Sequence, residues 1–164
     1  MAYTAAAWRD FAVTTGGLAG ALTGLLFVAV SLHSGALARS RSLASRAAQT
    51  LVLFMTPAIG AVVMAAPMPR TALGAVLLAV AAVSGGALLW LDRRAGHDLS
   101  AAGRAAAYID RASPNLLTAV LVGIAAITFL LKAGGGLYWM IPAVLAGLVG
   151  GVINAWLFLL KIPD

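Results

Sequence analysis

The residues that could carry acid–base or metal chemistry are few in this chain and lie far apart. All five acidic residues are Asp, cysteine is absent, and the two histidines have no further ligand at metal-binding spacing. The motifs that hold catalytic nucleophiles, nucleotide phosphates or zinc are missing too. No Asp lies in the middle of an apolar stretch, which argues against proton-coupled transport. We therefore expect no enzymatic activity, no cofactor and no metal site.

Three polar residues in or beside long apolar stretches remain as candidates for function. Asp10 precedes the first stretch, Thr23 lies within it, and Asn154 lies within the last. A ring of Asp10 carboxylates would attract cations if the first stretch lined an oligomeric pore. Pairing with Arg9, or with the dipole at a helix start, explains Asp10 more simply. Asn154 should face another helix, because a carboxamide finds its hydrogen-bond partners there and not in lipid.

Small residues recur at a spacing of four in two of the apolar stretches. The two ridges consist of Gly16, Gly20 and Gly24, and of Ala143, Gly147 and Gly151. Small residues on one helix face let another helix approach closely, and such packing is a main source of helix association in lipid. The ridges therefore predict helix contacts. They either dock on each other inside one bundle, or the first ridge joins two copies of the chain.

The elements that must position these residues follow from the composition. The 164 residues are 62% hydrophobic and 10% charged, whereas soluble domains carry about 25% charged residues. This predicts one membrane domain over residues 1–164, with the lipid bilayer as its solvent. The net charge of +6 is dispersed between apolar stretches and not gathered with aromatic residues, so we expect no nucleic acid partner.

Five apolar stretches are candidates for membrane-spanning helices. They cover residues 11–32, 47–66, 71–91, 115–131 and 137–160. About 20 residues of helix cross the hydrocarbon layer, and the stretches lack the alternation of barrel strands. The predicted fold is an all-α, polytopic transmembrane helix bundle of about five spans. The fourth stretch is short, and if it is tilted or re-entrant the number of spans is four.

The basic residues predict an orientation, because cytoplasmic loops are enriched in Lys and Arg. With five spans, eight of the eleven basic residues fall on one side. The amino terminus is then outside and the carboxyl terminus cytoplasmic. Segment 92–114 is expected to be a cytoplasmic amphipathic loop, with a short surface helix at 99–109. The Arg-, Ala- and Gly-rich composition fits a bacterial protein, which indicates a multi-pass protein of the inner (cell) membrane.

The first part of the chain resembles a known group of proteins. The stretch WRDF, then GALTGLLFVAVSL, a basic loop and a second apolar stretch with Pro57 are similar to small actinobacterial integral membrane proteins. The resemblance covers roughly the first 65 residues. Some of those proteins are described as modulators of the FtsH membrane protease. No motif here carries that role over, and no functional residue follows from the resemblance.

Two classes of function fit the pattern as a whole. The first is a non-enzymatic membrane subunit that acts through helix–helix association, either with further copies of itself or with a membrane-protein partner. The alternative is a small oligomeric ion channel or transporter whose first helix lines the pore. Both predict a homo-oligomer or a membrane complex.

Overall fold

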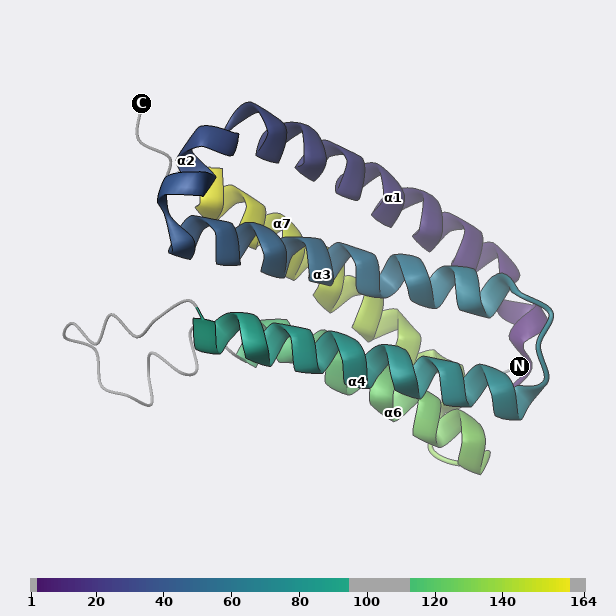
Figure 1. Cartoon of the computed structure of the whole chain (residues 1–164). Helices are drawn as coiled ribbons and strands as arrows, with labels where there is room; N and C mark the ends of the chain where they lie inside the picture. Colours follow the sequence, from purple (N-terminus) through teal and green to yellow (C-terminus); the bar gives the residue numbers. More distant parts are fainter. Residues whose placement is uncertain (1–2, 95–112, 160–164) are drawn as a thin grey trace.

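The computed structural model describes residues 3–94 and 113–159, and every regular element within these ranges is helical. The long elements are α1 (Arg9–Leu32), α3 (Arg41–Ala65), α4 (Arg70–Arg94), α6 (Ser113–Leu131) and α7 (Met140–Leu159). The short elements are the helix α2 (Ser34–Arg39) and the 3-10 turns η1 (Ala5–Trp8) and η2 (Gly136–Trp139). The long helices alternate in direction, and α7 ends at the opposite end of the bundle from the start of α1 (Figure 1). The predicted all-α class is confirmed over the described residues.

Apolar length identifies this chain as a membrane protein. Among the described residues, four segments are long and apolar enough to cross a bilayer: Ala5–Leu32, Leu43–Ala65, Arg70–Arg94 and Gly136–Leu157. The apolar part of α6, Leu116–Leu131, is shorter. It corresponds to the stretch that the sequence also marked as the short one.

Two helices extend beyond the apolar stretches that predicted them. α3 begins at Arg41, before the predicted start at 47, because the Ser40 side chain accepts a hydrogen bond from the Leu43 backbone N at 3.4 Å and caps the helix. α4 continues to Arg94, past the predicted end at 91. Charged residues limit how deep a helix lies in lipid, but they do not end it. Residues 92–94 therefore belong to α4 and not to the predicted loop, whose surface helix at 99–109 lies outside the described residues.

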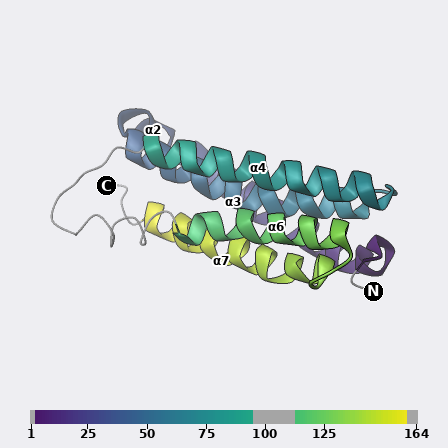
Figure 2. The same cartoon turned by 90° about the horizontal axis from the view of Figure 1, so that it is seen from below.

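The helix α3 is the centre of the bundle. It packs against α1, α4 and α7, and α6 packs against α4 and α7; α6 and α7 lie side by side below α4 and α3 (Figure 2). The larger apolar core joins α4, α6 and α7 through buried residues such as Leu77, Ala125 and Met140. A second cluster joins α1, α3 and α7 through Ala19, Phe54 and Leu148.

The helix α1 lies at the edge of the bundle. Its contacts are mainly with α3, and 17% of its apolar window is buried, against 61% for α3. Trp8 fixes its start: this buried ring makes edge contacts with Phe11 and Tyr138, at centroid distances of 5.5 Å and 5.0 Å. Most of the α1 surface therefore faces outward.

The turn between α6 and α7 uses glycine where the chain reverses. Gly134, Gly135 and Gly136 have φ angles of 76°, 106° and 55°, a region that side chains disfavour. The indole N–H of Trp139 donates to the Gly134 carbonyl at 2.7 Å. The result is an antiparallel α6–α7 hairpin.

The two prolines within long helices leave those helices continuous. Pro142 lies in the first turn of α7, where a backbone N–H has no partner within the helix. Pro57 lies inside α3, which runs unbroken from Arg41 to Ala65.

Candidate helix-contact surface

The inner face of α1 is made of residues at helical spacing. Ala12, Thr15, Ala19 and Leu26 are buried, and they recur every three, four or seven positions, as one helix face requires. Gly16 lies at the edge of this face, where an added Cβ would meet the Ala61 Cβ of α3 at 3.5 Å. This face holds α1 in the bundle.

The outer face of α1 carries the remaining glycines. An added Cβ at Gly17, Gly20 or Gly24 would meet nothing within 4 Å in the part of the chain that the structure describes. We call these three residues the outer glycine stripe. Exposed Val13 and Val28 lie beyond its two ends. The predicted ridge thus divides between two faces, because a spacing of four advances about 40° around a helix at each step. Gly17, which the spacing rule missed, belongs to the stripe as the residue three before Gly20.

The second ridge packs inside the bundle. Ala143, Gly147 and Gly151 are all buried. A Cβ at Gly147 would lie 3.1 Å from the Leu53 carbonyl oxygen, and one at Gly151 would overlap the Phe54 ring. These residues let α7 lie against α3. The expectation that the two ridges dock on each other is therefore wrong, because one faces α3 and most of the other faces outward.

The contrast between the two kinds of glycine is informative. An added Cβ at Gly74, Gly147 or Gly151 would press on a neighbouring helix, against the Leu130 side chain, the Leu53 carbonyl oxygen and the Phe54 ring respectively. The outer glycine stripe has no such neighbour among the residues that the structure describes. Each glycine in a helix costs about 1 kcal/mol relative to alanine, and no internal contact of the stripe offsets that cost.

A basic and an acidic residue lie at the amino-terminal end of the outer glycine stripe. Arg9 and Asp10 are both exposed, and Asp10 is the acidic residue of the first turn of α1, where it complements the helix dipole. Consecutive residues are about 100° apart around a helix, which puts Arg9 and Asp10 on opposite edges of the stripe. Within the described ranges, no ion pair joins them.

Thr23 and Asn154 do not extend this surface. Thr23 is half-buried, and its hydroxyl donates to the Ala19 carbonyl at 2.8 Å. It is thirteen positions from Asp10, which is about 140° around the helix, so the two side chains leave different faces of α1. Asn154 is half-buried and belongs to α7, not to α1. Its side chain or backbone has an interaction partner.

Comparisons with known proteins add no family to this description. No protein-family model, no curated protein and no solved structure matches the chain. Over the described residues, no group of acidic residues and histidines could hold a metal ion. The similarity to small actinobacterial membrane proteins stays a prediction from the sequence.

Proposed function

We propose that this protein is a non-enzymatic subunit of the bacterial cell membrane that associates with a second copy of itself through the outer glycine stripe of α1. The observation that carries the proposal is the position of Gly17, Gly20 and Gly24 on the open side of an edge helix, where an added Cβ would meet no other described residue within 4 Å. In lipid, close approach at small residues is a main source of helix association.

The charges beside the stripe favour a second copy over an unrelated helix. In a dimer with its two-fold axis along the membrane normal, both α1 helices are parallel and present the same face. Arg9 on one edge of the stripe then faces Asp10 of the other copy, and the contact repeats by symmetry. Two copies thus neutralise, at the outer end of the stripe, two exposed charges that one copy leaves unpaired within its described residues.

Five membrane crossings are part of the proposal. The alternating direction of the long helices supports them (Figure 1). α6 has 19 residues, about 28 Å at 1.5 Å per residue, close to the hydrocarbon thickness. With the basic residues on the inside, the amino terminus is outside and the carboxyl terminus is cytoplasmic.

The pore alternative has less support. A pore lined by α1 would use Asp10 and Thr23 on one face, whereas they leave the helix about 140° apart. The Thr23 hydroxyl also donates its hydrogen bond within its own helix, to the Ala19 carbonyl.

Replacement of one glycine in the stripe tests the proposal. In lipid nanodiscs or mild detergent, the wild-type chain should be a dimer, and Gly20→Ile should be a monomer with unchanged helix content. Gly86→Ile is the matched control, because Gly86 is exposed on α4 and its Cβ would also meet nothing within 4 Å. A monomeric wild-type protein, or dissociation by Gly86→Ile and not by Gly20→Ile, would contradict the proposal.

A further inference from the structure

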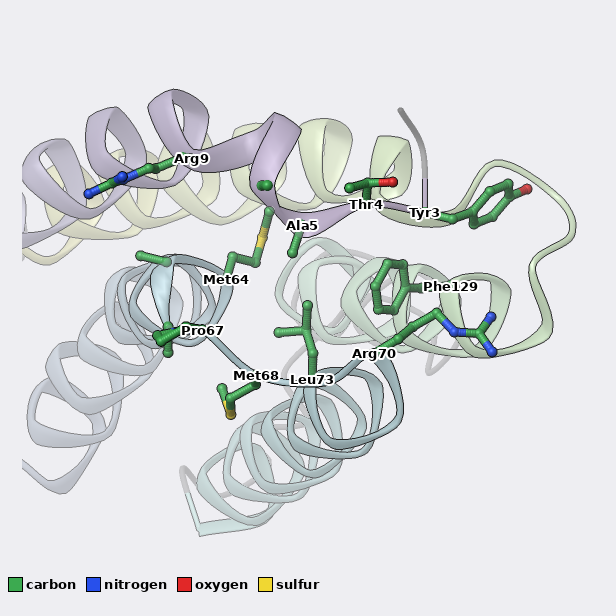
Figure 3. Close-up of a pocket in the computed structure, with 13 residues that line it drawn as sticks. Tyr3, Thr4, Ala5, Arg9, Met64, Pro67, Met68, Arg70, Leu73 and Phe129 are labelled. Atoms are coloured by element: carbon green, nitrogen blue, oxygen red, sulfur yellow. The ribbon is translucent and has the colours of Figure 1, made fainter.

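A cavity opens at the end of the bundle where the described chain begins. Its volume is about 730 Å³, within the range of about 300–1,000 Å³ typical of small-molecule sites. The turn η1, the link from α3 to α4 and the last turns of α6 surround it (Figure 3). Its walls therefore come from segments that are far apart in the sequence.

The middle of the cavity is apolar. Ala5, Met64, Leu73 and Phe129 point toward it from four different elements (Figure 3). Met64, Leu73 and Phe129 are buried and form the floor of the cavity. No charged side chain of the described lining residues reaches into this space. Methionine adapts its shape to an irregular partner, so these walls suit a flexible hydrocarbon better than a rigid polar molecule.

The edge of the cavity is positively charged. Arg9 and Arg70 line it from opposite sides, with their guanidinium groups directed away from the middle (Figure 3). None of the described lining residues is acidic, and the first turn of α4, which contributes Arg70 and Leu73, has no acidic residue either. The positive end of the α4 dipole therefore adds to the charge of the two arginines.

Arg70 keeps most of its binding capacity in this arrangement. Its Nη1 donates to the Leu130 carbonyl at 3.3 Å, which holds the side chain beside the cavity. A guanidinium has five N–H donors, so the remaining ones are available to an anion at the edge.

The position of the cavity limits what reaches it. The spanning candidates Ala5–Leu32 and Arg70–Arg94 both begin at this end of the bundle. In a bilayer, their ends lie at the level of the lipid headgroups. Lipids are the molecules at this depth that combine a hydrocarbon part with a phosphate.

From these observations we infer that the cavity binds one anionic phospholipid. The upper part of an acyl chain lies on the apolar floor, and the phosphate and headgroup lie at the edge, beside Arg70. A charge-assisted, bidentate contact from arginine to phosphate supplies the specificity. The inference concerns a single copy of the chain and does not depend on self-association.

The test is native mass spectrometry of the full-length protein in detergent, titrated with phosphatidylglycerol or with phosphatidylcholine of the same acyl chains. One molecule of phosphatidylglycerol should bind each copy, about tenfold more tightly than phosphatidylcholine, as expected for one charge-assisted contact. Glycerol phosphate, which has no acyl chain, separates a lipid from a soluble phosphate and should not compete. Equal binding of the two lipids, or full competition by glycerol phosphate, overturns the inference.

Two sets of variants locate the site, and each contains a matched pair of a change in the lining and a change outside it. Ala5→Phe fills the cavity and should weaken phosphatidylglycerol binding about tenfold or more, whereas Ala7→Phe, on the same turn but outside the lining, should not. Arg70→Gln should weaken binding about tenfold, Arg70→Lys should retain most of it, and Arg93→Gln at the far end should have no effect. Ala5→Leu is the smaller replacement if Ala5→Phe loses its helical circular dichroism. Equal effects of the two members of a pair would place the lipid elsewhere.

Discussion

Gly151 of α7 lies directly against the ring of Phe54 on α3, so closely that a Cβ at residue 151 would overlap the ring. A Cβ at Gly147, one turn earlier, would lie 3.1 Å from the Leu53 carbonyl oxygen, which is a tight contact but not an overlap. The two contacts place α7 closer to α3 than any larger residue would allow, and they bury the apolar cluster that includes Phe54 and Leu148.

Replacement of Gly151 by alanine should destabilise the bundle. A rigid aromatic ring cannot move aside at low cost, so overpacking of about 1–3 kcal/mol is expected. Gly150→Ala is the adjacent control, because its Cβ would meet Leu53 Cδ1 at an ordinary 3.9 Å. Thermal unfolding followed by circular dichroism in detergent measures both variants. Equal midpoints would mean that α7 does not pack this closely on α3.

Reversal of the charges beside the stripe should test the geometry of the proposed dimer. Arg9→Asp alone places like charges on both edges of the interface and should weaken dimerisation, as should Asp10→Arg alone. The double variant Arg9→Asp with Asp10→Arg restores opposite charges and should recover the dimer. Because exposed ion pairs contribute about 0–1 kcal/mol each, the expected change in the dimer dissociation constant is up to about fivefold per pair. Sedimentation equilibrium in detergent measures it, and no recovery in the double variant would argue against parallel α1 helices.

Single cysteines should report which side of the membrane each turn occupies, since the natural chain has no cysteine. With five crossings, a thiol at exposed Lys132 or at Pro69 reacts with an impermeant maleimide added outside intact cells, and a thiol at Gly35 does not. If α6 is re-entrant, Lys132→Cys is on the same side as Gly35→Cys and is protected. Labelling after cell lysis controls for reactivity.

Flux measurements should distinguish the proposed non-enzymatic subunit from the alternative of an ion channel lined by α1. Reconstituted protein should conduct no cations above the level of empty vesicles, and Asp10→Asn should change nothing. Reproducible cation flux that is reduced by Asp10→Asn would support the channel alternative, with Asp10 at the mouth of the pore.

The helices themselves could be predicted well from the sequence, and their ends less so. A long uncharged stretch must be helical in lipid, since its backbone groups have no other partners. The start of α3 at Arg41 depends instead on one weak signal, the cap at Ser40. The short apolar part of α6 could also be anticipated, because length alone distinguishes it.

The partners of the glycines could not be predicted. Spacing tells where a helix can be approached, but not which helix approaches it, and a four-residue spacing rotates gradually around the axis. Gly16 therefore faces Ala61, while Gly20 and Gly24 face outward. The end cavity could not be predicted from the sequence either, because its shape depends on how η1 and the α3–α4 link fold back over Phe129.

The hydroxyl of Tyr3 accepts a hydrogen bond from the backbone N–H of Gly135 at 3.3 Å, across 132 positions of the chain. A ribosome delivers Tyr3 well before the α6–α7 turn. The residues around Tyr3 therefore lack this partner until the α6–α7 hairpin has been inserted. The wall around the end cavity is thus completed only after the α6–α7 hairpin is in place, and a chain truncated before Gly135 would keep its first helices but lack this contact at Tyr3.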